Sequence, residues 1–346
     1  MDKQDASQPH AQQSKRQTRP VLVTDFPSFE PADLDRLYRE LGRDHVLVVG
    51  GYDVLRSALE QHPEIDVLCT GSIPDDLPTL APNLRWIQLP SAGADHLLRN
   101  GLPHSRLPLV ITTASGVHAT PITEYVFGSL LLHAWHWRRL LALQRDRTWA
   151  DESERTSLRG YELFGTTIGI VGLGHIGRHV AYLARAFGMR VLGVRRTSQG
   201  DAHDPDVDAL YRPEQLREML GQCDYVVIAT PSTPETHHLI GEGELRSMRP
   251  HAYLVNIARG NVIDEAALVR ALTQHWIGGA GLDVVEEEPL SPSSRLWSLP
   301  NAYLSPHISG ATRRYGTLLI DLLLENLHRY EASEPLLNVL DPERGY

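Results

Sequence analysis

The fold is decided by the stretch IGIVGLGHIG, residues 168–177. TIGIV at 167–171 has the composition of a buried strand, and the glycines that follow it have the spacing G-x-G-x-x-G. A helical pattern then runs to Gly188, and RVLGV at 190–194 predicts the next strand. A strand, a glycine turn, a helix and a second strand in this order predict a dinucleotide site of the Rossmann type.

Each residue of the turn GLGHIG has an expected task. Gly172 permits the tight turn, Gly174 lets a pyrophosphate approach the backbone, and Gly177 lets the helix pack closely on the strand. His175 and Ile176 complete the turn and open the helix, whose N-terminal amides favour an anion. We therefore expect all five residues to contact the cofactor.

The residue after the second strand predicts which dinucleotide is bound. An acidic residue usually holds the ribose 2′-hydroxyl there, but this chain has Arg195 followed by Arg196, with Thr197 and Ser198 as further donors. A guanidinium can form paired hydrogen bonds with a 2′-phosphate, which a carboxylate would repel. The sequence predicts that NADP(H) is preferred. The alternative is that both arginines are solvated and NAD(H) is bound.

Short apolar runs alternate with helical patterns along most of the chain, which predicts an α/β fold with parallel sheets. Two such series are present, and only the second has the glycine turn. We expect two doubly wound domains, with a Rossmann cofactor domain inserted into a flavodoxin-like substrate domain. The predicted divisions are a disordered tail at 1–19, a substrate domain at 20–117 plus 312–346, and an NADP(H)-binding domain at 118–311.

The predicted strands of the first series are 21–25, 45–49, 65–70, 84–89 and 107–112; those of the second, after 190–194, are 224–230, 252–258, 278–285 and 302–307. Thr120-Pro121 predicts the start of one long helix over 121–145, placed between domains or subunits. A last helix is predicted over 311–331. Trp297 is expected in the core, with a ligand contact as the alternative.

Composition excludes several classes of protein. The formal charge of −10 argues against nucleic acid as a partner. The longest apolar stretch, 125–135, is too short to span a bilayer, and the N-terminal 20 residues have no signal-peptide core. Cys69 and Cys223 each follow an apolar run and are expected as buried free thiols of a cytoplasmic protein. His133 and His136 have no accompanying ligand motif, so no metal site is expected.

Three residues with acid–base or anion-binding chemistry end successive predicted strands of the second series. They are Arg259, Glu288 and His307. The carboxyl ends of parallel strands meet at one sheet edge, where doubly wound sheets bind ligands. Beside a nicotinamide, the arginine would hold the carboxylate of a 2-keto acid. The histidine would donate a proton to the ketone oxygen, and the acid would orient the imidazole and favour its charged form.

With these residues in view, the sequence resembles the D-isomer-specific 2-hydroxyacid dehydrogenase family over about residues 20–335. The motifs that carry the resemblance are PSAGADH at 90–96, GIVGLGHIG at 169–177, TPSTPETHHLI at 230–240, NIARGNVIDEAAL at 256–268, LDVVEEEPL at 282–290 and SPHISG at 305–310. The resemblance implies that Arg259, Glu288 and His307 are the catalytic Arg, Glu and His.

The resemblance also implies roles for residues that the pattern alone does not mark. It implies a loop whose backbone amides bind the substrate carboxylate, a segment that passes the cofactor, and an acid near the nicotinamide carboxamide. These are Ser91, Ala92 and Gly93 for the loop, Thr230 and Pro231 for the segment, and Asp283 for the acid. It further implies a homodimer with the 121–145 helix at its interface.

The predicted function is reduction of a small 2-keto acid, such as glyoxylate or hydroxypyruvate, to the D-2-hydroxy acid with NADPH, or the reverse. One alternative is a dehydrogenase of a larger acid such as 3-phosphoglycerate, which would need further cations such as Arg56 or Arg85. The other is a cofactor-sensing protein of the corepressor kind that keeps the fold without turnover.

Overall fold

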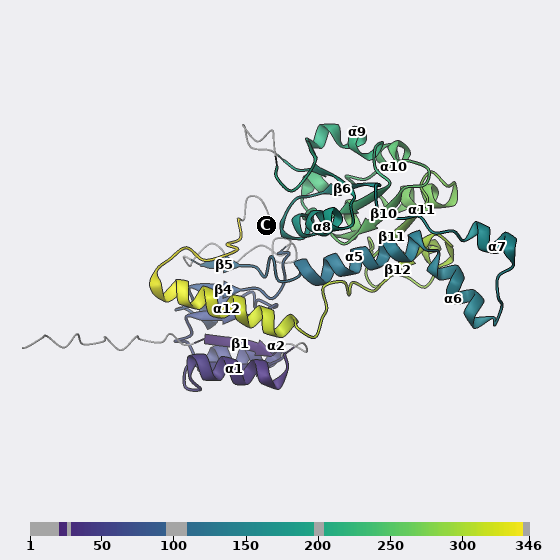
Figure 1. The fold of residues 1–346 in the computed structure, drawn as a ribbon. Helices are drawn as coiled ribbons and strands as arrows, with labels where there is room; N and C mark the ends of the chain where they lie inside the picture. The colour runs from purple at the N-terminus through teal and green to yellow at the C-terminus, as the bar shows by residue number, and fades with distance from the viewer. Residues whose placement is uncertain (1–20, 26–28, 95–108, 197–203, 342–346) are drawn as a thin grey trace, which may run out of the picture.

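The computed structural model describes residues 21–25, 29–94, 109–196 and 204–341. Within these ranges the chain forms two separate parallel sheets with helices between the strands (Figure 1). The predicted α/β class with two doubly wound sheets is confirmed. The predicted tail at 1–19 lies outside the described residues.

The first sheet has five strands in the order β2-β1-β3-β4-β5, all parallel. This is the strand order of flavodoxin-like folds. Its strands are β1 Val21–Asp25, β2 Val46–Gly50, β3 Val67–Cys69, β4 Trp86–Gln88 and β5 Val110–Thr112. Its first helices are α1 Pro31–Leu41, α2 Tyr52–Gln61 and α3 Leu77–Leu80.

The second sheet has seven parallel strands in the order β12-β11-β10-β9-β6-β7-β8. Its strands are β6 Thr167–Val171, β7 Arg190–Val194, β8 Ala209–Tyr211, β9 Tyr225–Ile228, β10 Tyr253–Asn256, β11 Gly279–Leu282 and β12 Ala302–Leu304. Its helices are α8 His175–Ala186, α9 Leu216–Leu220, α10 Glu242–Ser247 and α11 Glu265–Thr273. The strand order reverses beside β6, which makes the end of β6 the switch point where such sheets bind ligands.

The chain passes between the two sheets twice. It leaves β5 through residues 113–118 into α5 (Ala119–Ala134), and it returns from β12 through residues 305–314 into α12 (Tyr315–Ala332). Helix α12 packs on the first sheet, because its buried apolar face shares a core cluster with β1, β3 and β4. The second unit is thus inserted into the first along the chain. The boundaries at 117/118 and 311/312 stay predictions.

The long helix predicted over 121–145 is wrong in its continuity. The structure has α5 up to Ala134 and a separate α6 (Trp137–Arg145), because His136 between them has φ 51°, in the left-handed region. A left-handed residue cannot continue a right-handed helix, so the chain turns there. Helices α6 and α7 (Glu152–Ser157) then project from the body of the second unit (Figure 1).

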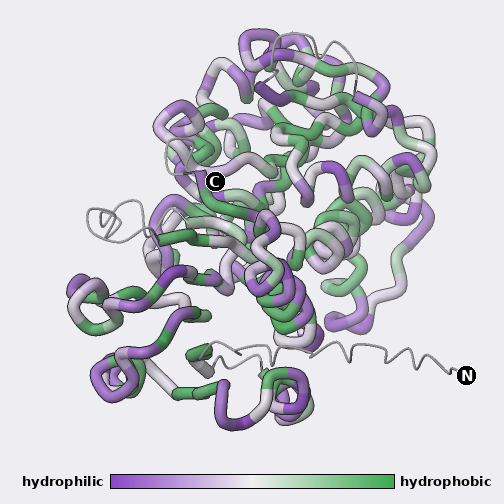
Figure 2. Tube along the Cα trace, turned by 90° about the vertical axis from the view of Figure 1, so that its left-hand side faces the viewer, coloured by the Kyte–Doolittle hydropathy of each residue, from purple (hydrophilic) through white to green (hydrophobic). Residues whose placement is uncertain are grey.

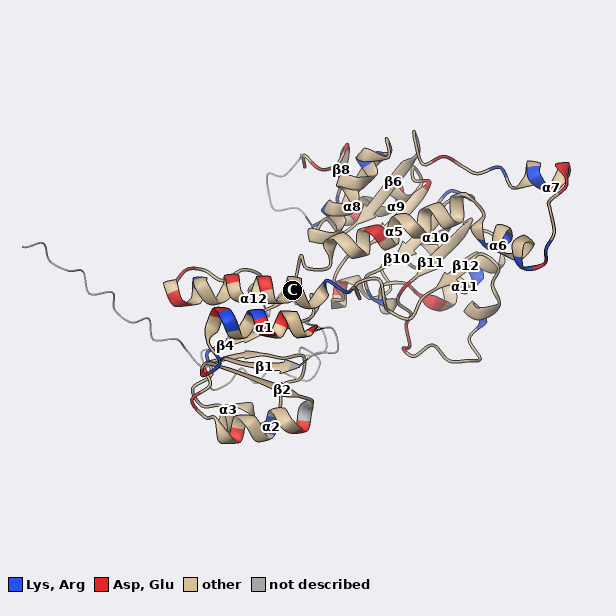
Figure 3. Ribbon diagram, turned by 60° about the horizontal axis from the view of Figure 1, so that its bottom comes forward, with Lys and Arg blue, Asp and Glu red and all other residues tan. Residues whose placement is uncertain are grey.

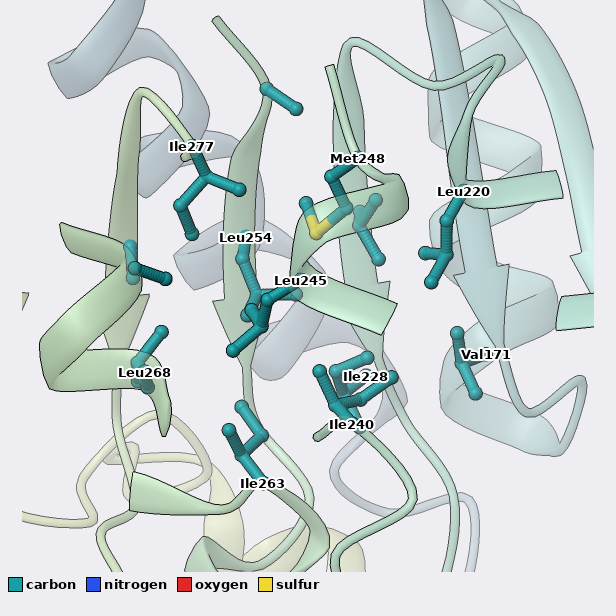
Figure 4. Packing of buried hydrophobic residues seen from close by; sticks show 14 of the residues in the cluster. Val171, Leu220, Ile228, Ile240, Leu245, Met248, Leu254, Ile263, Leu268 and Ile277 are labelled. Carbon is teal, nitrogen blue, oxygen red and sulfur yellow. The ribbon is translucent and has the colours of Figure 1, made fainter. Parts of the chain in front are cut away.

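Hydrophobic segments gather inside both units, and hydrophilic segments occupy the outer helices and turns (Figure 2). The second unit's largest cluster joins strands to α9, α10 and α11; Figure 4 shows part of it, including Ile228, Leu245, Leu254 and Leu268. Strand β8 was missed by sequence reasoning because it is only three half-buried residues at a sheet edge. Trp297 is 55% exposed, so its predicted place in the core is wrong.

Both cysteines are free and buried, as predicted, and burial raises the pKa of each thiol to about 12. His133 stacks on Tyr253 with ring centroids 4.1 Å apart, and burial lowers its pKa to about 4. Within the described ranges no three His, Cys, Asp or Glu residues are grouped as a metal site would need. None of the helices described is long and apolar enough to cross a bilayer.

Asp224 ties strand ends together at the edge of the second sheet opposite the glycine turn. Its carboxylate accepts hydrogen bonds from the Thr167 amide at 2.8 Å, from Arg249 Nη1 at 2.5 Å and from His251 Nε2 at 2.8 Å. Burial opposes its ionisation, but the hydrogen bonds and Arg249 lower its pKa overall.

Cations and acids are interspersed along the outer helices (Figure 3).

Candidate active site

The glycine turn has the geometry that a dinucleotide needs. Gly172 has φ +103°, and a Cβ there would lie 2.7 Å from the Ala229 carbonyl oxygen. A Cβ on Gly177 would lie 2.0 Å from the Gly172 carbonyl oxygen, so helix and strand are in direct backbone contact. A Cβ on Gly174 would meet no atom within 4 Å, so this side of the turn is open. Gly174 caps α8, whose first amides therefore face that open space.

The residue after β7 lies in an ionic network that sequence reasoning missed. Arg195 Nη1 lies 3.0 Å from Asp204 Oδ2, and Arg178 binds the same carboxylate with contacts of 3.0 and 2.9 Å. Burial opposes the ionisation of Asp204, but hydrogen bonds from Arg178 and the Asp206 amide lower its pKa overall. Asp204 is 2% exposed, so Arg195 is held by a carboxylate that is itself buried in the protein. Thr197 and Ser198 lie outside the described residues.

Arg196 lies near the turn that follows β9. The pKa of Glu235 in that turn is lowered, first by the hydrogen bond from Thr233 and to a smaller extent by Arg196. The strand end that carries the two arginines therefore lies within electrostatic range of the segment after Thr230 and Pro231, as expected if both border one cofactor site.

A cavity of about 190 Å³ lies between the two units and gathers most of the predicted ligand-binding residues. From the first unit and the crossover it is lined by Ala92, Gly93, Ala94, Ser115 and Gly116; from the second by Gly174, His175, Ile176, Ala229, Thr230, Pro231, Ser232, Ile257, Ala258 and Arg259. The substrate loop and the glycine turn thus face the same space. Ser91 closes its own loop, because its hydroxyl donates to the Gly93 carbonyl at 2.7 Å.

Arg259 lies three residues beyond the end of β10, directly before a short 3₁₀ turn at Gly260–Val262. Its Nη1 donates to its neighbour's carbonyl, Ala258 O, at 2.8 Å, and its own carbonyl accepts from Asn256 Nδ2 at 3.0 Å. The next residue, Gly260, packs so closely that a Cβ there would lie 1.9 Å from the Val285 carbonyl carbon. Only glycine permits this contact, which joins the turn of Arg259 to the turn that leads to Glu288.

Glu288 and His307 form a direct pair. Glu288 Oε2 lies 2.9 Å from His307 Nδ1, and the other carboxylate oxygen accepts from the Val285 amide at 3.3 Å. A carboxylate only accepts, so Nδ1 carries a proton and Nε2 is left for a ligand. Both side chains are partly exposed, as a group that must meet a substrate requires.

Asp283 is 1% exposed and holds the loop that carries His307. Its Oδ1 accepts from the Ser305 hydroxyl at 2.6 Å and the Ile308 amide at 2.9 Å, and its Oδ2 accepts from the Ser309 amide at 3.0 Å. The His307 amide donates to the Asp283 carbonyl at 2.8 Å. These contacts define a supporting role that sequence reasoning missed. Its contact with a nicotinamide carboxamide stays a prediction.

The Glu288–His307 pair lines a second cavity of about 600 Å³. Its other walls are Asp283, Val285, Pro289, Leu290, Trp297, Leu304, Ser305 and Pro306. Trp297 is held there by a hydrogen bond from its Nε1 to the Ser291 carbonyl at 3.0 Å. Arg259 lines the cavity between the units, so the structure places the three predicted catalytic residues in two cavities. Gly260, the residue after Arg259, contacts Val285 in the wall of the second cavity.

The second unit is a Rossmann sheet with a glycine turn, and the first unit contributes small loop residues to the cavity between them. Together with Arg259 and the Glu288–His307 pair, these features are those of a nicotinamide-dinucleotide dehydrogenase of the two-domain class. Residues 127–309 match the family described as D-isomer specific 2-hydroxyacid dehydrogenase, NAD binding domain. The chain belongs to the D-isomer-specific 2-hydroxyacid dehydrogenase family.

Individual relatives agree with this assignment. The chain is similar to a glyoxylate reductase of Pyrococcus furiosus, with 37% identity over 289 residues that cover 80% of this chain and 82% of the relative. Its structure is similar to a D-isomer specific 2-hydroxyacid dehydrogenase family protein from Aeromonas salmonicida, with a TM-score of 0.79, 30% identity, and coverage of 94% and 99%. It is also similar to an NADPH-dependent glyoxylate/hydroxypyruvate reductase from Sinorhizobium meliloti in complex with NADP and sulfate, with a TM-score of 0.77, 27% identity, and coverage of 94% and 100%.

Proposed function

We propose that this protein reduces a small 2-keto acid of the glyoxylate or hydroxypyruvate kind to the D-2-hydroxy acid with NADPH, and catalyses the reverse reaction when the product is in excess. The observation that carries the proposal is the 2.9 Å contact between Glu288 and His307, at the same sheet edge as Arg259 and the glycine turn. This pair supplies a proton donor where a dinucleotide domain supplies a hydride.

The residues of the chain divide the work. The guanidinium of Arg259 binds the carboxylate of the keto acid, and the backbone amides of the loop Ser91–Gly93 complete the anion site. His307 Nε2 donates its proton to the ketone oxygen, and Glu288 stabilises the imidazolium before that step and holds the ring in place after it. When bound, the reduced nicotinamide supplies the hydride to the carbonyl carbon.

The described residues fit a nicotinamide dinucleotide. The open side of Gly174 faces the cleft, and the first amides of α8 suit a pyrophosphate. We propose that Arg195 and Arg196 bind the 2′-phosphate and make NADP(H) the preferred cofactor. Two cations at this position attract the phosphate, and Asp204 orients the guanidinium of Arg195.

Two observations support a small monocarboxylate as the substrate. The cavity between the units is small, about 190 Å³. The described residues that line it from the first unit and the crossover carry no charged side chain; they are Ala92, Gly93, Ala94, Ser115 and Gly116. Arg56, a predicted candidate for holding a phosphorylated acid, binds Asp76 through two contacts of 2.7 and 2.6 Å. A phosphorylated acid would therefore find little cationic charge on this wall.

The deciding experiment is a screen of NADPH oxidation by the purified full chain over about a dozen 2-keto acids, with NADH run in parallel. Turnover of glyoxylate or hydroxypyruvate with a preference for NADPH supports the proposal. Selective turnover of a phosphorylated acid would replace it with a dehydrogenase of larger acids. Tight NADPH binding without turnover of any keto acid would make the protein a cofactor sensor.

We also propose a homodimer that uses α5 and α6. Trp135 directly after α5, and Trp137 and Leu141 on α6, are 47%, 48% and 53% exposed. Such exposure is unusual for large apolar side chains that lie close together unless a partner covers them. Light scattering at micromolar concentration should give about twice the mass of the chain. A monomer under these conditions would contradict the proposal.

The two buried free thiols fit the predicted cytoplasmic location.

A further inference from the structure

The two crossovers between the sheets are linked by a pair of stacked rings. His118 ends the first crossover and caps α5, and Tyr315 ends the second and begins α12. Their ring centroids are 5.1 Å apart with an interplanar angle of 11°. The two residues are far apart in the sequence and meet because the chain crosses between the two sheets at both places.

Each ring also binds a backbone carbonyl on a different side of the cleft. The Tyr315 hydroxyl donates to the carbonyl of Pro90, the residue that opens the substrate loop. The His118 Nδ1 lies 3.3 Å from the carbonyl oxygen of Gly310, the end of the loop that carries His307. A Cβ on Gly310 would lie 3.0 Å from this nitrogen, so the imidazole rests closely on the loop.

The protonation state of His118 follows from its surroundings. A carbonyl oxygen only accepts, so the bond to Gly310 requires the proton on Nδ1. Burial lowers the pKa of His118, the Gly310 carbonyl opposes this effect, and the charge of Arg259 adds to it. His118 is therefore a neutral donor that lies within the electrostatic range of the residue proposed to bind the substrate carboxylate.

We propose that His118 and Tyr315 are positioning residues, which together hold the substrate loop and the His307 loop in fixed relation across the cleft. Tyr315 acts on the loop that follows Pro90, and His118 acts on the loop that ends at Gly310. The inference rests on the proposed function, because it assigns to these loops the tasks of binding the carboxylate and delivering the proton. Both residues act through other groups.

The two halves of this clamp predict two different kinetic effects. Tyr315→Phe keeps the stack but removes the bond to Pro90, so KM for the keto acid should rise about 2- to 12-fold, the range of one neutral hydrogen bond, with kcat nearly unchanged. His118→Ala releases the loop of His307, so kcat should fall about 10- to 100-fold because the proton donor is misplaced. NADPH affinity should stay within about twofold in both variants.

Conservative substitutions separate positioning from general support. His118→Asn places an amide donor near the position of Nδ1 and should restore most of the lost kcat, although it lacks the stack. Tyr182→Phe is the matched control, because Tyr182 is 70% exposed on α8, and it should change neither constant. Thermal melts of every variant show whether the fold is kept, and if His118→Ala does not fold, His118→Asn and Tyr315→Phe still carry the test.

The outcomes decide the clamp and the proposed function separately. The clamp alone is overturned if the wild type reduces keto acids and the variants behave like Tyr182→Phe. It is also overturned if each variant changes kcat and KM by the same factor. A wild type without turnover overturns the proposed function. In that case small-angle scattering decides the clamp, because the double variant His118→Ala/Tyr315→Phe should have a larger radius of gyration than Tyr182→Phe, and an equal radius would refute it.

Discussion

Two alanine substitutions in the glycine turn should have opposite effects. Gly172→Ala should destabilise the protein, and Gly174→Ala should leave stability unchanged but weaken cofactor binding. The reason is local: at Gly172 φ is +103° and a Cβ would lie 2.7 Å from a carbonyl oxygen, whereas at Gly174 a Cβ would meet nothing within 4 Å.

The magnitude for Gly172→Ala follows from two terms. A non-glycine residue in such a backbone conformation costs about 1–3 kcal/mol, and forcing a methyl group into backbone contact costs about 1–3 kcal/mol more. The sum of about 2–6 kcal/mol corresponds to a fall in Tm of about 5–20 °C for a domain of this size. For Gly174→Ala the added methyl occupies the space where the pyrophosphate meets the backbone, so the Kd for NADPH should rise at least about 10-fold.

The assays are a thermal melt of each variant without cofactor and a fluorescence titration with NADPH. Gly128→Ala is the matched control, because a Cβ there would also meet nothing within 4 Å and Gly128 lies on α5, outside the glycine turn. It should leave Kd unchanged, and it should not lower Tm, because alanine is favoured over glycine inside a helix. The reasoning is refuted if Gly172→Ala melts with the wild type, or if Gly174→Ala binds NADPH as tightly as Gly128→Ala does.

Further substitutions test single side chains. Arg195→Asp should lower kcat/KM for NADPH about 10- to 100-fold, since a hydrogen bond to a charged group contributes roughly 1.5–3 kcal/mol; equal wild-type use of both cofactors would contradict the assignment. Arg259→Lys should raise KM for the keto acid with NADPH binding kept, because an ammonium cannot form the paired bonds of a guanidinium; parallel loss of both would indicate a structural role. His307→Ala should lower kcat by about 10²–10⁴-fold. Glu288→Gln should move the alkaline fall of kcat/KM for reduction to lower pH. An unchanged pH profile would exclude the pair as the catalytic unit. The pKa of Asp224 is lowered in the folded state, so its stabilisation is present above the ordinary aspartate range and is lost as pH falls through the folded-state pKa; urea melts should show a smaller loss toward acid for Asp224→Asn than for the wild type.

Much of the fold was predictable because its signals are local. The spacing of Gly172, Gly174 and Gly177 encodes a turn within six residues, and apolar runs of strand length predict buried parallel strands. Parallel strands place their carboxyl ends at one edge, so Arg259 and His307 could be assigned to the same edge from the sequence alone.

Other features could not be predicted, because they depend on which distant groups meet. The helix break at His136 is not marked by a proline or a glycine. Trp297 is a large apolar residue of the kind usually found in a core, but it lines a cavity. The hydrogen bonds by which the Asp283 carboxylate holds the loop of His307 also have no local signal in the sequence.

The sequence by itself determined the fold class, the family and the glycine turn, and it named the candidate site residues, since all of these follow from short motifs and periodic patterns. Only the tertiary structure decided that Asp204 holds Arg195, that Gly260 joins the turns of Arg259 and Glu288, and that His118 stacks on Tyr315 between the crossovers. Each of these contacts joins side chains or backbone whose separation along the chain carries no periodic signal. Burial and hydrogen-bond geometry select the pairs, and both exist only after the two sheets have packed.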